Sequence, residues 1–170
     1  MADIDFQEFT SGANIAGKDR WIFVEKDYDG SEPKNDVLQH GTCMLSKVAG
    51  FRYGSAKNIK PVIVRAAART GPNAVTVRPE NYLEGVAKVL DDVGTHGKKA
   101  ILSMSWFYPR KVEGHWTFPD PEDKQKDGSL GFQIRLRMLL RELVNKGVSP
   151  ITGSGNNGVV SARRSIPVAR

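Results

Sequence analysis

The chain has 170 residues, of which 39% are hydrophobic and 26% charged, and its formal net charge is +6. This composition excludes an intrinsically disordered chain and is typical of one folded domain with a core. No apolar run approaches the length of a membrane-spanning helix, and the acidic N-terminus lacks the apolar core of a secretory signal. We therefore expect no membrane partner. The sequence does not indicate a cellular compartment.

The positive charge is interpreted as solvated surface. Basic residues are mixed with Asp and Glu over helix faces, and a local excess lies at the end of the chain, at Arg163, Arg164 and Arg170. No stripe in which aromatic and basic residues alternate is recognised, so we expect no nucleic-acid partner. The single cysteine, Cys43, excludes an internal disulfide.

The first third of the chain predicts two strands and a helix. Residues 1–20 are expected to be irregular, and 21–24 form a short apolar run that predicts a strand. Residues 27–33 predict a solvated loop; their acidic spacing also suggests calcium, although the glycine and terminal glutamate of an EF-hand loop are misplaced. A helix is predicted from about 40 to 48, ended by Gly50 as a left-handed cap, and a buried strand at 61–65.

The rest of the chain alternates helices and strands. The predicted helices are 79–93, with Pro79 in its first turn and Gly94 at its end, and 130–145, capped by Gly147. Their apolar faces are Tyr82, Val86, Val89, Leu90 and Val93 in the first helix, and Phe132, Leu136, Leu139, Leu140 and Leu143 in the second. The predicted strands are 100–105 and 148–152, and 107–128 is expected to be a long loop.

This order predicts an α/β fold with a mostly parallel sheet. Single helices that connect successive strands imply a parallel sheet with helices on its faces. Ligand sites in such sheets form beyond the carboxyl ends of the strands. Ser105 and the segment 153–158 both follow predicted strands, so we expect a site there.

His40 is the first candidate for catalysis. It opens the helix predicted over 40–48, and the electropositive end of a helix disfavours a cation. The neutral imidazole is therefore favoured, and a neutral imidazole can act as a general base. The alternative is that His40 is only a capping or surface residue.

Three segments together resemble the subtilase family, the subtilisin-like serine peptidases. They are the His-Gly-Thr sequence at 40–42, the strand sequence at 101–105, and the segment 146–158, which contains Gly-Asn-Asn-Gly. The resemblance runs from about residue 5 to residue 158 and is greatest to fungal members. It implies a three-layer α/β fold, incomplete here, with a partial peptidase domain over 1–158 and a divergent basic tail over 159–170.

The resemblance also implies the roles of individual residues in peptide-bond hydrolysis. His40 matches the histidine of the catalytic triad, which takes the proton from the nucleophilic serine. Asn156 matches the asparagine whose amide stabilises the oxyanion of the tetrahedral intermediate. No cofactor and no metal is implied, and the partner would be a peptide or protein substrate.

Substrate-binding residues follow from the same resemblance. Ser105, Trp106 and Phe107 match the edge segment that pairs with an extended substrate and lines its first specificity pocket. Ser154 and Gly155 would form the other wall of that pocket. Trp106 and Phe107 depart from the small residues common in the family, and the alternative for both is packing in a core.

The triad aspartate and serine have no clear match in the sequence. Asp3 and Asp5 lie in a segment that resembles the one just after the aspartate motif, and neither Ser161 nor Ser165 has the required glycine context. We therefore expect a serine endopeptidase by family that is inactive as written. The alternative is a non-catalytic remnant that binds peptides or a partner.

Overall fold

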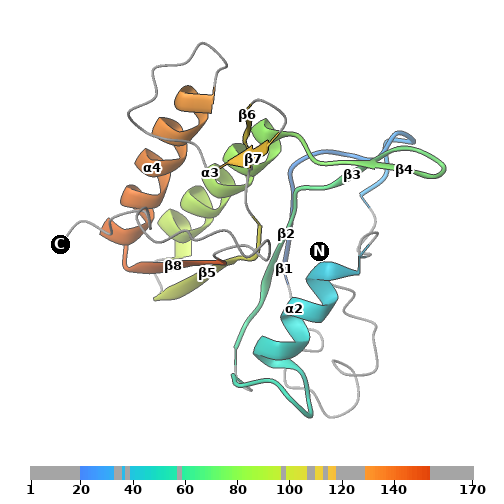
Figure 1. Cartoon of the computed structure of the whole chain (residues 1–170). Coiled ribbons are helices and arrows are strands. Elements are labelled where there is room, and N and C mark those ends of the chain that lie inside the picture. The colour runs from blue at the N-terminus through green and yellow to red at the C-terminus, as the bar shows by residue number, and fades with distance from the viewer. Residues whose placement is uncertain are drawn as a thin grey trace. The chain divides into compact units, whose positions relative to one another are not determined.

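The computed structural model describes residues 20–32, 36, 39–56, 59–96, 99–106, 110–112, 115–117 and 129–153 (Figure 1). The chain divides into two compact units, Met1–Asp92 and Val93–Arg170. Each unit contains a pair of parallel strands that are connected through a helix. The α/β character predicted from the alternating pattern is therefore confirmed.

In the first unit, a helix connects two parallel strands. Strand β1 (Arg20–Phe23) pairs with β2 (Val62–Arg65), and helix α2 (His40–Ala49) lies between them in the chain. The register places Arg20 opposite Val62 and Phe23 opposite Arg65. These bounds agree closely with the strands expected at 21–24 and 61–65 and with the helix expected at 40–48.

A hairpin that the sequence pattern did not predict follows β2. Strands β3 (Ala68–Gly71) and β4 (Ala74–Thr76) pair antiparallel, with an irregular register between Arg69 and Gly71. Both strands are too short to show a clear alternation of polar and apolar residues, which explains why they were missed.

Helix α3 (Pro79–His96) begins at the predicted proline. It lies close to the strands at Gly85, where a Cβ atom would come within 3.2 Å of Val64 Cγ1 and 3.5 Å of Val24 Cγ2. Val86 and Val93 of its predicted apolar face are buried. The helix does not end at Gly94, as the sequence suggested, but continues to His96 because a single glycine inside a helix costs only about 1 kcal/mol.

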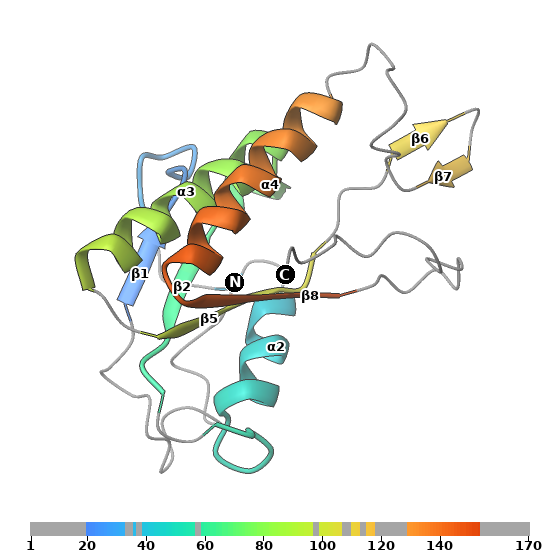
Figure 2. The ribbon, with the colours of Figure 1, turned by 90° about the vertical axis from the view of Figure 1, so that its left-hand side faces the viewer.

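The second unit repeats the parallel strand–helix–strand arrangement (Figure 2). Strand β5 (Ala100–Met104) pairs with β8 (Val148–Thr152), and helix α4 (Ser129–Asn145) packs against β8. Leu140 and Leu143 of the predicted apolar face are buried, as is Val148. Gly147 has φ of 82°, so the predicted left-handed cap is confirmed.

Part of the segment expected as a long loop forms a second hairpin. Strands β6 (Arg110–Val112) and β7 (His115–Thr117) pair antiparallel within 107–128. Strands of three residues lie below the length at which periodicity can be read, so the sequence indicated only a loop.

The cap predicted at Gly50 is wrong in its conformation. Gly50 is extended, with φ of −61° and ψ of 151°, rather than left-handed. Its N–H donates to Ser46 O at 3.0 Å, and the chain then turns back so that Gly54 N–H donates to Gly50 O at 3.0 Å. A Cβ atom at Gly54 would lie 2.3 Å from Gly50 N, so this close contact of two backbones requires a glycine at position 54.

Among the described residues, the strands form separate two-stranded sheets. β2 pairs with β1, and β5 pairs with β8. One continuous parallel sheet that includes 62–65, 100–104 and 148–152 therefore stays a prediction. Within the same part of the chain, no helix is long and apolar enough to cross a membrane.

Candidate functional site

His40 is the first residue of α2, as the sequence predicted. The preceding residue, Gln39, has φ of 56° and makes no capping hydrogen bond with its side chain. The side chain of His40 is exposed, so it is not a core residue. Cys43 lies one turn later on the same helix and is also exposed.

The helix start is capped by Asp36, a residue that the sequence analysis did not single out. Asp36 Oδ2 accepts hydrogen bonds from Thr42 N–H and from the Thr42 hydroxyl, both at 2.7 Å. A carboxylate at this position satisfies an N–H group that the helix itself leaves open, and it also offsets the helix dipole. Because Asp36 supplies the cap, the imidazole of His40 is not required for it.

The predicted substrate segment begins at the carboxyl end of β5. Met104 is paired with Thr152, and Gly153 N–H donates to Met104 O at 3.3 Å, so the ends of β5 and β8 are level. Ser105 is exposed directly after this edge and Trp106 is half-buried. The structure thus brings Ser105 to the same end of the strand pair as Gly153.

The other predicted site residues lie outside the described part of the chain. These are Phe107, Ser154, Gly155 and Asn156. The basic tail at 159–170 and the four rejected triad candidates, at positions 3, 5, 161 and 165, also lie outside it. Their proposed roles stay predictions.

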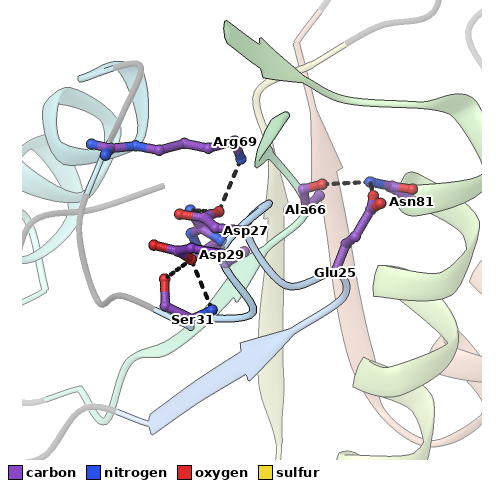
Figure 3. Close-up of polar contacts among 8 residues, drawn as sticks. Glu25, Asp27, Asp29, Ser31, Ala66, Arg69 and Asn81 are labelled. Carbon is purple, nitrogen blue, oxygen red and sulfur yellow. Dashed lines mark hydrogen bonds and ion pairs between the residues drawn. The ribbon is translucent and has the colours of Figure 1, made fainter. Parts of the chain in front are cut away.

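The loop after β1 is not the simple solvated loop that was expected. Asp27 is only 5% exposed, and its Oδ1 accepts a hydrogen bond from Arg65 Nη2 at 2.6 Å and another from Arg69 N–H at 2.9 Å (Figure 3). Arg65, the last residue of β2, is fully buried. Burial of an ion pair is favourable only where hydrogen bonds satisfy the charges. Here Nη2 of Arg65 is satisfied by Asp27, whereas the buried Nη1 of the same guanidinium has no hydrogen-bond partner among the described residues.

The loop closes on itself around Asp27 and Asp29. Asp27 N–H donates to Ser31 O at 2.9 Å, and Gly30, with φ of 81°, donates to Asp27 O at 2.8 Å. Asp29 Oδ1 accepts from the Ser31 hydroxyl at 2.6 Å and from Ser31 N–H at 2.9 Å, which lowers the pKa of Asp29. The carboxylates that suggested calcium are thus bonded within the protein.

A second polar network joins the strands of the first unit to α3. Asn81 Nδ2 donates to Glu25 Oε2 at 2.9 Å and to Ala66 O at 2.8 Å (Figure 3). Arg78 Nη2 donates to Glu25 Oε1 at 3.0 Å. Asn81 is buried, so both of its donated bonds stabilise the start of the helix. These contacts connect Glu25 and Ala66 to the start of α3.

Within the described ranges, no group of three His, Cys, Asp or Glu side chains is arranged to hold a metal ion. Chemically, the described part of the site offers an exposed imidazole at a capped helix start and an exposed hydroxyl at Ser105, directly after β5. Comparison of the chain with protein-family models, curated proteins and solved structures finds no match. The geometry therefore has to be interpreted on its own chemistry.

Proposed function

We propose that this chain carries the histidine segment of a subtilisin-like serine endopeptidase domain and that His40 is its general base. One observation supports this proposal above the others. His40 starts the helix that connects two parallel strands, and its side chain is exposed while Asp36 supplies the helix cap. Because Asp36 already caps the helix, the exposed imidazole is not needed for capping, and this favours proton transfer as its role.

In the proposed reaction the imidazole accepts the proton of a serine hydroxyl as that serine attacks the scissile carbonyl, and later donates it to the leaving amine. Ser105 and Trp106 would hold an extended substrate along the edge of β5, and Asn156 would stabilise the oxyanion. The serine motif has no match among these 170 residues, so the chain by itself is expected to be inactive.

The proposal predicts that α2 and the carboxyl ends of β5 and β8 lie at one edge of a common sheet. A nitroxide attached to Cys43, the only cysteine in the chain, tests this without any substitution. The label should broaden the amide resonances of Ser105 and Gly153 more than those of Ala100 and Val148. The latter pair lies at the opposite ends of the same strands, roughly 15 Å away along the strand.

The same sample with the nitroxide reduced by ascorbate gives the reference spectrum. A Cys43→Ser chain treated with the reagent shows whether any broadening comes from unattached label. Equal broadening at both ends, or stronger broadening at Ala100 and Val148, would contradict the subtilisin-like arrangement and remove His40 from the site.

A second candidate function is peptide binding without hydrolysis. It is favoured by the exposure of Ser105 directly after β5, because an exposed strand edge can add an extended peptide through backbone hydrogen bonds. Titration with an N-acetylated tetrapeptide should change the tryptophan fluorescence of the chain. A Trp106→Phe variant should abolish the change, whereas Trp21→Phe, in the first unit, should preserve it; the reverse pattern would exclude binding at this edge.

A further inference from the structure

The outer face of α4 carries apolar side chains that the strand pair next to the helix does not cover. Helix α4 packs against β8 (Figure 2), and its residues Leu140 and Leu143 are buried. Ile134 and Met138 are instead 50% and 63% exposed. Successive residues of a helix are turned by about 100°, so Ile134 and Met138 lie on the side opposite to the two buried leucines. The helix is thus apolar on two sides, and one of them is exposed.

The exposed side chains follow the spacing with which one helix packs along another. Ile134, Met138, Arg141 and Asn145 recur at intervals of four, three and four residues, and all of them are exposed. Gly131 precedes Ile134 by three residues and continues the series. An alternation of three and four residues is the pattern of a helix-packing seam. We refer to Gly131, Ile134, Met138, Arg141 and Asn145 as the outer stripe of α4.

Gly131 leaves a hollow at the start of the outer stripe. Nothing lies within 4 Å of the position that its Cβ atom would take. The packing around this position therefore does not require a glycine, and a glycine weakens a helix relative to alanine. A glycine on an exposed helix face does allow the side chain of a partner to approach the helix backbone closely.

The outer stripe is basic. Arg135 lies along one side of it, Arg137 lies along the other side, and Arg141 lies within it; all three are exposed. Among the described residues, no ion pair involves any of these arginines. The sequence of the helix contains a single acidic residue, Glu142. Charge complementarity therefore requires a partner that carries carboxylates or other anions on either side of an apolar centre.

The composition of this face favours a protein as the partner. Methionine and arginine are enriched in the interfaces between proteins, whereas lysine is depleted. The cations of the outer stripe and its flanks are all arginines, and its most exposed apolar side chain is Met138. The planar guanidinium also matches the geometry of a carboxylate with two parallel hydrogen bonds.

Other anionic partners fit this face less well. None of the exposed residues described in α4 is aromatic, so a nucleic acid would place phosphates over Ile134 and Met138 without any ring on which its bases could stack. Helices that bind to lipid surfaces insert a wide apolar face, usually with Trp, Phe or Leu. The outer stripe offers Ile134 and Met138 alone for such insertion.

We propose that the outer stripe of α4 binds an acidic amphipathic helix of a partner protein. Apolar side chains of the partner pack around Ile134 and Met138, and one of them enters the hollow at Gly131. Carboxylates of the partner pair with Arg135 and Arg137 along the two sides. Helix α4 carries none of the residues assigned to the proposed peptidase site, so this inference goes beyond that function and either proposal can fail without the other.

A fluorescein-labelled peptide tests the proposal on the full chain by fluorescence anisotropy. The peptide is a designed helix of about three heptads, with Leu at the two core positions of each heptad and Glu at the two flanking positions. It should bind the chain. The same peptide with Lys in place of Glu should bind at least about tenfold more weakly, because its charges would face arginines.

Substitutions along the outer stripe should change the affinity in both directions. Ile134→Ala and Met138→Ala should each weaken binding at least about fivefold, as expected of central interface residues. Arg137→Glu should weaken it at least about tenfold, because like charges would then face each other. Gly131→Leu should fill the hollow and weaken binding, although it removes a glycine from the helix. Glu142→Gln should strengthen binding, a gain that partial unfolding cannot produce.

Ile101→Ala and Lys99→Ala are the matched controls. Ile101 is 70% exposed on β5, and Lys99 is an exposed cation just before that strand, so both lie in the same unit but outside α4. Each should leave the affinity within about twofold of the wild-type value, as is usual for surface substitutions. Circular dichroism of every variant should show that the fold is preserved.

Several results would overturn the proposal. They are absence of binding of the acidic peptide, equal binding of the acidic and basic peptides, and equal weakening by Ile101→Ala and Ile134→Ala. Vesicles that contain phosphatidylserine and a single-stranded oligonucleotide should each compete poorly with the labelled peptide. If either competes as effectively, at equal charge, as the unlabelled acidic peptide does, the face binds lipid or nucleic acid instead and the proposal is wrong.

Discussion

The buried ion pair between Asp27 and Arg65 leads to the sharpest stability prediction. Asp27→Asn keeps the size of the side chain but removes its charge, and it deprives the fully buried Arg65 of the carboxylate to which its Nη2 donates. The substitution also weakens the bond from Arg69 N–H, because a neutral oxygen is a poorer acceptor than a carboxylate.

The expected loss follows from the burial of both side chains. The exposed fractions of the Arg65 and Asp27 side chains are 0% and 2%, so solvent screening is negligible. Removal of one partner from such a pair costs about 3–5 kcal/mol in the free energy of unfolding. Since a small domain is stable by only about 5–15 kcal/mol, Asp27→Asn should remove a large share of the stability of the first unit.

Urea denaturation followed by tryptophan fluorescence measures this loss. Substitution of Trp106 and Trp116 by Phe leaves Trp21, on β1, as the only reporter and restricts the signal to the first unit. The double variant Asp27→Asn/Arg65→Met should recover much of the stability, because a well-packed apolar side chain can replace a buried charge at little or no cost.

Asp29→Asn is the control for the loop itself. Asp29 bonds only to Ser31 among the contacts described and is exposed, so this substitution should change the free energy of unfolding by no more than about 0.5 kcal/mol. If Asp27→Asn also costs less than about 1 kcal/mol, the pair is not buried and charged as described, and the reasoning is refuted.

Three further outcomes are expected. Gly54→Ala should destabilise the first unit by about 1–3 kcal/mol in the same urea assay, because its Cβ would lie 2.3 Å from Gly50 N. Gly131→Ala, which has nothing within 4 Å of its Cβ, should instead stabilise α4 by about 0.5–1 kcal/mol. Equal effects of the two substitutions would contradict this reasoning. Burial raises the pKa of Tyr82, so the stability that its neutral phenol contributes is fully present below about pH 10 and is lost as the pH rises through the higher folded-state pKa. Absorbance at 295 nm should show one late-ionising tyrosine that Tyr82→Phe removes. Simultaneous ionisation of all tyrosines would count against this burial of Tyr82. The purified chain should neither hydrolyse casein nor react with a fluorophosphonate probe, and labelling that His40→Ala abolishes would show that a serine of this chain does act as the nucleophile.

Much of the fold was predictable because the elements involved have a strong local pattern. The spacing of apolar residues from Val86 to Val93 and from Leu136 to Leu143 identified α3 and α4, and the buried faces agree. Pro79 and Gly147 act through their own backbone preferences, so their positions at a helix start and a helix end needed no tertiary information. His40 at the start of α2 was predictable because a polar turn precedes it and small and apolar residues at helical spacing follow it.

Polar contacts between distant parts of the chain were not predictable in this way. Asp27 and Arg65 are separated by 38 residues, and nothing in the local pattern distinguishes this aspartate from a solvated one. Asp36 was also missed as the cap of α2, because it lies six residues before Thr42. An ordinary capping residue lies only two or three positions before the N–H group from which it accepts a hydrogen bond.

The sequence by itself determined where the main helices and strands lie, because propensity, periodicity and capping act within a few residues. Only the tertiary structure decided that the aspartate of an apparently exposed loop is buried against the end of β2, and that Gly50 is extended rather than left-handed. Both depend on segments that meet in space, Asp27 with Arg65 and Gly54 with Gly50, where desolvation and steric exclusion outweigh local preference.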